Sequence, residues 1–338
     1  MEGCTRRRRD GRITPLSERV CVIVNPAAGQ GRGATMLPAI RSAFAAYGVT
    51  EVRLTREWRD ERKLAADAIA HGFTTIVAVG GDGTTANIAN VILHSESDAR
   101  LGVIPAGTGN DFAMVLGTDG NSMEMVARRA VQSGDSRVDV GRIEDTFFLN
   151  SCGFGFDVAV LQGLGQVRWL RGKAVYLYTA LTQLFRFRGL HVTVETTLVS
   201  RRRSLHMMLL IANGPWFGGG IPIAPTALVT DGELDAIAVH DVSAFRRLLI
   251  LVAVARGRHP RYAEVHIERA AGFTVAFDAM PIYEADGEIH QAKSASVLVR
   301  CIPGALRVVT GDAGLRAPRT PSIPAKKRRV KFAPHPNW

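Results

Sequence analysis

Three short glycine-rich segments combine small residues with side chains that can handle phosphate or a cation. They cover residues 25–33, 80–84 and 105–113. Glycine lets backbone N–H groups approach a phosphate closely, and a helix that follows adds the positive end of its dipole. The first segment contains no Gly-Lys-Ser/Thr, so it is not a Walker loop. Together the three segments predict a site for the phosphates of a nucleotide.

Acidic side chains lie inside the second and third of these segments. Asp82 has glycine on both sides, which is more glycine than a simple turn needs, and Asp111 follows Asn110. A carboxylate among phosphate-binding amides is useful when a divalent cation accompanies the nucleotide. Asp111 could equally cap the helix that follows it, and the two roles are compatible.

The elements around these segments predict where they meet. Strand-like apolar runs alternate with helical patterns through short loops, which implies a parallel sheet with helices on both faces. Ligands bind at the carboxyl ends of the strands in such sheets, and all three segments follow a strand. The expected strands are 20–25, 49–55, 75–79 and 101–104, and the expected helices are 35–47, 60–71 and 85–94.

From about residue 137 the pattern changes to short strands, which is typical of an antiparallel sandwich or barrel. Helical stretches at 169–187 and 243–255 interrupt it, and the stretch at 146–151 is expected to be one strand. We therefore predict an α/β fold with two parts. Residues 18–136 form a doubly wound nucleotide-binding domain, and residues 137–302 form a β-sandwich domain for a second substrate.

The formal charge of +11 is concentrated at the two ends of the chain. Residues 1–12 carry +3 and residues 316–338 carry +7, which leaves about +1 for the body between them. We expect a disordered basic arm at 1–17 and a disordered, proline-rich basic tail at 316–338. A nearly neutral body predicts no specific nucleic-acid partner, and the tails could tether the chain to an anionic membrane.

The overall composition excludes several classes of protein. With 46% hydrophobic and 22% charged residues, the chain is neither mainly disordered nor collagen-like. Its longest apolar runs are shorter than the ~20 residues that a membrane helix needs. We expect a cytoplasmic protein, peripheral to the membrane. The oligomeric state stays open, and a homodimer is one option.

Taken together, the glycine-rich segments resemble the catalytic domain of the diacylglycerol kinase family, which includes soluble bacterial lipid kinases and the sphingosine kinases. Two later segments agree. Residues 217–235 resemble the signature of the family's second domain, and residues 285–288 resemble its late Asp-Gly-Glu motif. The resemblance implies an active site in the cleft between the two domains. It also implies that residues 303–312 return to the first domain.

This resemblance implies an ATP-dependent lipid kinase. Such an enzyme transfers the γ-phosphoryl group to a hydroxyl of diacylglycerol or a related lipid, with Mg²⁺ as a cofactor. The proton acceptor would be Asp286 or Glu288, and Asp82 stays a candidate. From the residues alone, Asp286-Gly287 is a common hairpin signal. The resemblance assigns ATP to Asn25, Pro26, Ala27, Ala28, Gly29, Thr55, Gly81, Asp82, Gly83, Thr84, Thr85, Asn87 and Thr108.

Two metal sites are expected. Asp82, Asp111 and Asp235 could hold the catalytic Mg²⁺ through water, because Mg²⁺ takes few protein ligands. The resemblance to bacterial members implies a second, structural metal. Its ligands would be Asp231 and the carbonyl oxygens of Leu228 and Glu233. The alternative, that these acids only shape turns, has equal weight.

Two alternative functions remain open. An NAD kinase would share Gly-Gly-Asp-Gly, although residues 105–113 and 218–225 resemble the lipid branch. A catalytically silent module could bind a membrane or nucleic acid through its tails, although the retained acids argue against it. Residues 166–190 mix basic and aromatic side chains around an apolar helix, which suits an anionic membrane surface. An ordinary helix packed on the sandwich would look the same.

Overall fold

The computed structural model describes residues 19–120, 123–132, 136–164, 173–195, 202–312 and 314–316. The basic arm expected at 1–17 lies outside the described residues, and so does the expected tail apart from Arg316. Residues 165–172, the first part of the basic and aromatic stretch, also lie outside them.

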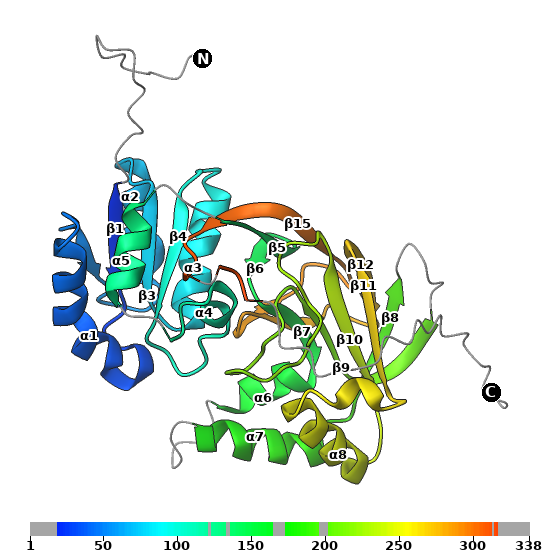
Figure 1. Cartoon of the computed structure of the whole chain (residues 1–338). Helices are drawn as coiled ribbons and strands as arrows, with labels where there is room; N and C mark the ends of the chain where they lie inside the picture. The colour runs from blue at the N-terminus through cyan, green and yellow to red at the C-terminus, as the bar shows by residue number, and fades with distance from the viewer. Residues whose placement is uncertain are drawn as a thin grey trace, which may run out of the picture.

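The N-terminal part is built on four parallel strands (Figure 1). β1 (Val20–Val24) and β3 (Thr75–Gly80) are buried along their whole length. Such runs suit the central strands of a sheet that is covered on both faces. β2 (Val52–Leu54) pairs with β1, and β4 (Arg100–Pro105) pairs with β3.

Helices cover both faces of this sheet. α1 (Ala28–Ala45) and α5 (Met123–Val131) pack on the face that carries Val22 and Val24. α2 (Asp60–Ala70) and α3 (Asp82–His94) pack on the opposite face. A short helix, α4 (Asp111–Leu116), follows β4. The doubly wound α/β fold expected from the sequence is confirmed.

The C-terminal part is an antiparallel β-sandwich, as expected. A layer of helices covers one side of it, at the bottom of Figure 1. The strands are β5 (Ser136–Ile143), β6 (Thr146–Phe148), β7 (Ser151–Gly155), β8 (Leu190–Glu195), β9 (Arg202–Ala212), β10 (Leu234–His240), β11 (Val265–Ala270), β12 (Gly272–Phe277), β13 (Ile282–Ala285), β14 (Glu288–Gln291) and β15 (Ser296–Val308). The helices are α6 (Phe156–Leu164), α7 (Lys173–Arg186), α8 (Ala244–Ala255) and the 3-10 turn η1 (His259–Arg261).

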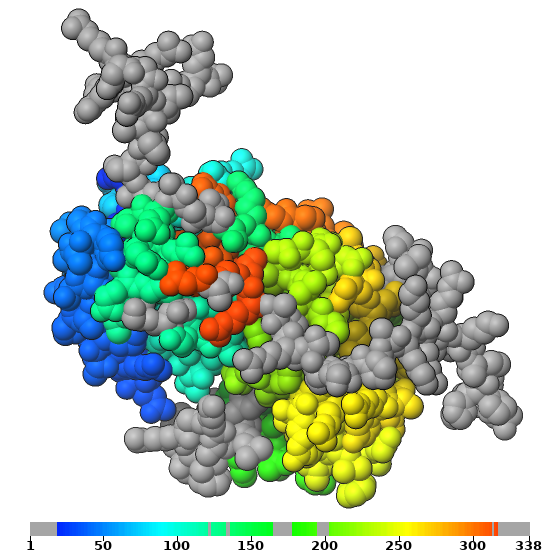
Figure 2. Space-filling model, in the orientation of Figure 1, coloured from blue at the N-terminus to red at the C-terminus, as the bar shows by residue number. Residues whose placement is uncertain are grey.

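The long strand β15 belongs to both sheets. It pairs antiparallel with β12 and β5, and its residues Arg307 and Val308 then pair in parallel with β4. Figure 2 shows the last described residues, in orange-red, against the cyan-to-green surface of the N-terminal part. The two parts therefore share backbone hydrogen bonds as well as side-chain contacts.

One expected strand is wrong in part. Residues 146–151 do not form a single strand, because β6 ends at Phe148 and β7 begins at Ser151. The backbone N–H groups of Leu149 and Asn150 instead donate to the carboxylate of Asp286. A pair of N–H groups that is used in this way cannot also continue a strand ladder.

Candidate active site

The three glycine-rich loops meet at the carboxyl ends of β1, β3 and β4. A Cβ atom built on Gly29 would lie 2.1 Å from the carbonyl oxygen of Ala106. One built on Gly107 would lie 2.4 Å from the Cα of Gly81. Backbones that come this close leave room for glycine only. The structure thus brings the first and second loops against the third, as the parallel sheet predicts.

Asn25 ties the first loop to the second. Its Oδ1 accepts the N–H of Ala27 at 3.0 Å, and its Nδ2 donates to Thr84 Oγ1, also at 3.0 Å. Gly29, Gln30 and Gly31 then adopt positive φ angles of 57°, 61° and 94°. This left-handed stretch separates the loop from the regular part of α1.

The remaining residues expected to bind ATP lie around this edge. Thr55 follows β2, and its N–H donates to the carbonyl of Val24 at 2.9 Å. The Thr85 hydroxyl donates to the carbonyl of Gly81 at 3.1 Å in the first turn of α3. Thr108 is exposed in the third loop. Pro26, Ala28 and Gly83 lie within the first and second loops themselves.

Asp82 lies against the start of α4. Its Oδ2 accepts the N–H of Asn110 at 2.6 Å, and its Oδ1 accepts the N–H of Phe112 at 3.4 Å. Burial raises the pKa of Asp82, and these backbone bonds partly oppose the rise. The carboxylate is therefore fixed in place at the junction of the second and third loops.

The side chain of Asp111 connects the N-terminal part to the C-terminal part. Its carboxylate accepts the N–H of Gly219 at 3.0 Å and the N–H of Gly220 at 2.7 Å. Burial and the charge of Asp82 raise the pKa of Asp111 to about 6, against the lowering effect of the two N–H bonds. The glycine loop of the second domain is thus held against the third glycine-rich loop.

Asp286 lies in the two-residue hairpin between β13 and β14. Asp286 and Gly287 have φ angles of 47° and 85°, as a type I′ turn requires. The hairpin that Asp-Gly indicates is therefore present, and its carboxylate still faces the interior. It accepts the N–H groups of Leu149, Asn150 and Ser151 at 2.6, 2.8 and 3.3 Å. Burial raises its pKa to about 7 against those bonds, and the charge of Asp82 adds to the rise.

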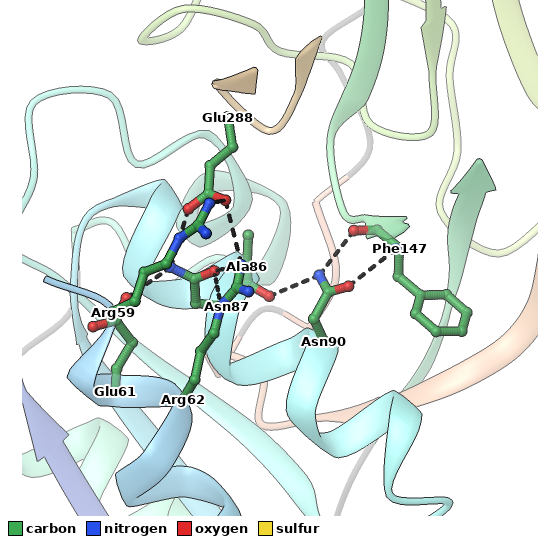
Figure 3. A network of polar contacts seen from close by, with 8 residues as sticks. All are labelled: Arg59, Glu61, Arg62, Ala86, Asn87, Asn90, Phe147 and Glu288. Atoms are coloured by element: carbon green, nitrogen blue, oxygen red, sulfur yellow. Dashed lines mark hydrogen bonds and ion pairs between the residues drawn. The ribbon is translucent and has the colours of Figure 1, made fainter. Parts of the chain in front are cut away.

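Glu288 joins this hairpin to the N-terminal part (Figure 3). Its carboxylate accepts from Arg59 Nη2 at 2.7 Å, Arg62 Nη2 at 3.3 Å and Asn87 Nδ2 at 3.2 Å. Asn87 also donates to Glu61 at 2.7 Å. Nothing in the sequence marked the two arginines, because they meet Glu288 only through the fold.

A cavity of about 500 Å³ opens beside Glu288 between the two parts. α3 supplies Asn87, Asn90 and His94 to its wall, and β6 supplies Phe147. Asn90 is itself fixed to β6, because its Nδ2 donates to the carbonyl of Phe147 and its Oδ1 accepts the N–H of the same residue (Figure 3). The cavity therefore has walls from both parts of the chain.

Asp235 lies in a different cluster from Asp82 and Asp111. It accepts from the Thr226 hydroxyl at 3.4 Å and faces Arg269 Nε at 3.5 Å. Burial raises its pKa, while Arg269 lowers it. Within the described residues, no group of three or more His, Cys, Asp or Glu side chains is arranged to hold a metal ion. The expectation for Asp82, Asp111 and Asp235 is contact with Mg²⁺ through water, and it stays a prediction.

The loop expected to hold a structural metal is held by two acids, Asp231, which the sequence singled out, and Asp139, which it did not. Asp231 accepts the N–H of Glu233 at 3.1 Å and faces Arg269. Buried Asp139 accepts the N–H of Gly232 at 2.7 Å from this loop, and the N–H of Gly304 at the same distance. Leu228 lies at the start of the loop and is exposed. A lone aspartate in a strand carries no local signal of such a role.

Comparison with known proteins places this geometry in a family. Residues 19–143 match the family model described as "Diacylglycerol kinase catalytic domain". Residues 150–310 match the model described as "YegS C-terminal NAD kinase beta sandwich-like domain". The two matches follow one another and cover the same two parts that the fold shows.

Individual relatives agree with these matches. The protein named "Probable lipid kinase YegS-like" from Pseudomonas putida is 32% identical over 70% of this chain and 81% of its own length. The protein named "Diacylglycerol kinase" from Mycobacterium tuberculosis is 28% identical over 91% of this chain and 97% of its own. A crystal structure of a diacylglycerol kinase from Bacillus anthracis has the same fold, with a TM-score of 0.67 at 21% identity, over 89% of this chain and all of that one. The chain therefore belongs to the lipid kinase family that joins a diacylglycerol kinase catalytic domain to a YegS-type C-terminal domain.

Proposed function

We propose that this chain is an ATP-dependent kinase that phosphorylates a hydroxyl group of diacylglycerol or a closely related lipid. The observation that carries the proposal is that Asp82 and Asp286, from opposite parts of the chain, lie near enough for the charge of Asp82 to raise the pKa of Asp286. One lies among the loops suited to phosphate, and the other lies on the Asp-Gly-Glu hairpin. The product would be a phosphatidate-type lipid and ADP.

In this proposal the N-terminal loops hold the nucleotide. The loops around Gly29, Gly81 and Thr108 lie at the carboxyl edge of the sheet, where phosphates bind in folds of this type. Thr55 and Asn87 would contact the rest of the nucleotide. The first turn of α3 adds its dipole to the stabilisation of phosphate.

Asp82 and Asp111 are suited to a hydrated divalent cation. They lie close enough that the charge of Asp82 raises the pKa of Asp111, and a cation would relieve that repulsion. Each carboxylate oxygen can accept more than one hydrogen bond, so the N–H bonds leave capacity for water. When bound, Mg²⁺ would neutralise charge on the phosphates. A structural metal at Asp231, Leu228 and Glu233 belongs to the proposal as well.

Asp286 is the side chain that we assign as proton acceptor. As the lipid oxygen bonds to the γ-phosphorus and ADP leaves, the hydroxyl proton would pass to the Asp286 carboxylate. A pKa of about 7 suits a general base near neutral pH. Because the base must be unprotonated, turnover should rise as the pH rises through about 7. Glu288 would hold the cleft closed through Arg59 and Arg62, and Asp82 is the alternative base.

A radiolabelled ATP assay against lipids in mixed micelles tests the proposal, with NAD included as a substrate. Label in a lipid and not in NADP is expected. Label in NADP alone would refute the lipid proposal in favour of an NAD kinase, and no transfer at all would favour a silent binding module. Asp286→Asn should abolish turnover while calorimetry still detects ATP binding. Asp278→Asn, on an exposed acid of the same domain, is the control and should keep wild-type turnover.

We further propose that the lipid is reached at an anionic membrane, through the layer formed by α7 and α8. Phe185 and Phe245 are each 71% exposed. Arg247 joins the helix ends that carry them, because its Nη1 donates to the carbonyls of Leu184 and Phe187 at 2.8 Å. Neither helix contains an acidic residue, so the side chains of these helices do not repel an anionic surface.

Sedimentation with vesicles tests this membrane surface. Phe185→Ser combined with Phe245→Ser should weaken binding to phosphatidylglycerol vesicles. Leu298→Ser, on an apolar side chain of β15 that is 54% exposed, should leave binding unchanged. Equal binding by the double variant and the wild type would remove this surface from the proposal. Within the described residues, the longest apolar helices are too short to cross a bilayer.

A further inference from the structure

Two acids lie buried beneath the Asp-Gly-Glu hairpin. Asp157, in the first turn of α6, is 3% exposed, and Glu284, on β13, is 0% exposed. Buried carboxyl groups normally have a cation or several hydrogen-bond donors. Among the described residues, neither oxygen of Asp157 has a well-formed hydrogen bond, and only one oxygen of Glu284 has one.

The backbone places these two carboxyl groups side by side. Gly153 of β7 is the residue directly opposite Glu284 on β13. A Cβ atom on Gly153 would lie 1.7 Å from Asp157 Oδ2, so the Asp157 carboxyl group occupies the space that a side chain at 153 would fill. Residues opposite one another in antiparallel strands project from the same face, about 5 Å apart. Asp157 therefore stands next to Glu284 on that face.

Among the described residues, no basic group acts on the charge of this pair. The titratable groups that do are the Cys152 thiol of β7 and the Asp286 carboxyl of the hairpin. From β9, apolar Leu210 packs over Gly153. Burial raises the pKa of Asp157 and of Glu284. The charge of Asp157 raises the pKa of Glu284 further. Two adjacent carboxyl groups without a cation cannot both ionise.

Glu284 connects the pair to the hairpin turn. Its Oε2 accepts the N–H of Gly287 at 2.8 Å. The neighbouring turn N–H, that of Asp286, donates to the carbonyl of Ser151 at 3.0 Å. These contacts fix both central residues of the turn, and one of the two contacts depends on Glu284.

We propose that Asp157 and Glu284 share one proton in an O–H···O hydrogen bond, and that Glu284, held in this way, positions the Asp-Gly-Glu turn through Gly287. Glu284 touches neither substrate nor nucleotide in this proposal and is a positioning residue. The shared proton explains why two carboxyl groups can be buried together without a cation. The catalytic consequence rests on the proposed kinase function, whereas the shared proton does not.

Three variants separate positioning from simple packing. Glu284→Leu keeps a similar volume but removes the acceptor for Gly287. It should lower kcat by between about 10- and 100-fold, as small misplacements of reacting groups do, with KM for ATP within about twofold because the nucleotide loops are untouched. Glu284→Gln should restore kcat to within about threefold, since its carbonyl accepts from Gly287 and its NH₂ donates to Asp157. Glu124→Gln, at an exposed site on α5, is the control.

Infrared spectroscopy tests the shared proton without any assay of activity. The wild type at pH 6 should show the C=O band of a buried protonated carboxyl group, with a shift in D₂O. The double variant Asp157→Asn, Glu284→Gln keeps the shape of the pair and should lose the part of that band due to the pair, whereas any contribution from Asp111 and Asp286 is present in both proteins. Identical spectra for the two proteins would overturn the shared proton, whether or not the chain phosphorylates a lipid.

The kinetic outcome decides the positioning role. Wild-type kcat in Glu284→Leu would overturn it, and so would equal losses in Glu284→Gln and Glu284→Leu when both melt like the wild type. Should Glu284→Leu fail to fold, the pH profile of Glu284→Gln decides instead. Wild-type kcat should fall at alkaline pH as the shared proton leaves, and this fall should disappear in Glu284→Gln. An unchanged alkaline fall would overturn the role.

Discussion

The buried pair of Asp157 and Glu284 makes the stability of this protein depend on pH in a direction that can be worked out. In an unfolded chain both groups titrate near their usual pKa values, about 3.9 for Asp and about 4.3 for Glu. In the folded chain burial raises both values, that of Asp157 to about 7. Between about pH 4.5 and pH 7 the folded state therefore binds at least one more proton than the unfolded state.

The sign and size of the effect follow from proton linkage. Since the folded state binds the extra proton, the free energy of unfolding falls as the pH rises through this window. Each retained proton contributes about 1.4 kcal/mol per pH unit. Over about two and a half units, the pair should lower the free energy of unfolding by ~3 kcal/mol. The stabilisation is fully present in acid and is lost towards neutral pH.

Urea unfolding of the wild type and of the Asp157→Asn, Glu284→Gln double variant, at pH 4.5, 5.5, 6.5 and 7.5, measures this effect. Other buried acids such as Asp111 and Asp286 are present in both proteins, so their contributions cancel in the difference. The wild type should lose stability relative to the variant by ~3 kcal/mol across the series. Parallel pH dependences would refute the assignment of a retained proton to the pair.

Two further changes test the packing of the glycine-rich loops and of the sheet behind them. Gly107→Ala would place a methyl group 2.4 Å from the Cα of Gly81, so calorimetry should show at least tenfold weaker ATP binding and unfolding a stability loss of ~1–3 kcal/mol. The control Gly120→Ala adds a methyl group with nothing within 4 Å and should match the wild type. Arg100 is 1% exposed, and its guanidinium group donates to Thr75 and to the carbonyls of Ala130 and Gln132. Arg100→Lys loses these donors, so thermal unfolding should show a loss of stability of ~2–4 kcal/mol. An unchanged unfolding midpoint would refute the role of those bonds.

The features that the sequence predicted are those with local chemistry. The glycine loops could be found because three strand–loop–helix units repeat the same turn residues, and the doubly wound sheet follows from that repeat. The Asp286-Gly287 hairpin is similarly encoded by two adjacent residues. Both features are present in the structure, at the places where the pattern puts them.

The features that the sequence did not predict depend on contacts between distant residues. Arg59 and Glu288 are 229 positions apart, and no spacing rule joins them. Asp157 is a second case, because its place beside Glu284 exists only where Gly153 leaves room for it. Helix α6, which carries Asp157, was also not expected, since it begins directly after a strand with no polar turn between them.

Strand β15 has a consequence for how the protein folds during synthesis. β4 would be an open edge of the N-terminal sheet until Arg307 and Val308 pair with it, and those residues are made after nearly all of both domains. A nascent chain usually completes its first domain before the second emerges. Here the strand that pairs with β4 emerges only after the rest of both domains has been synthesised, so the edge of β4 stays unpaired until then. Both halves should consequently reach their final stability together, and truncation before residue 307 should make the N-terminal half prone to aggregation.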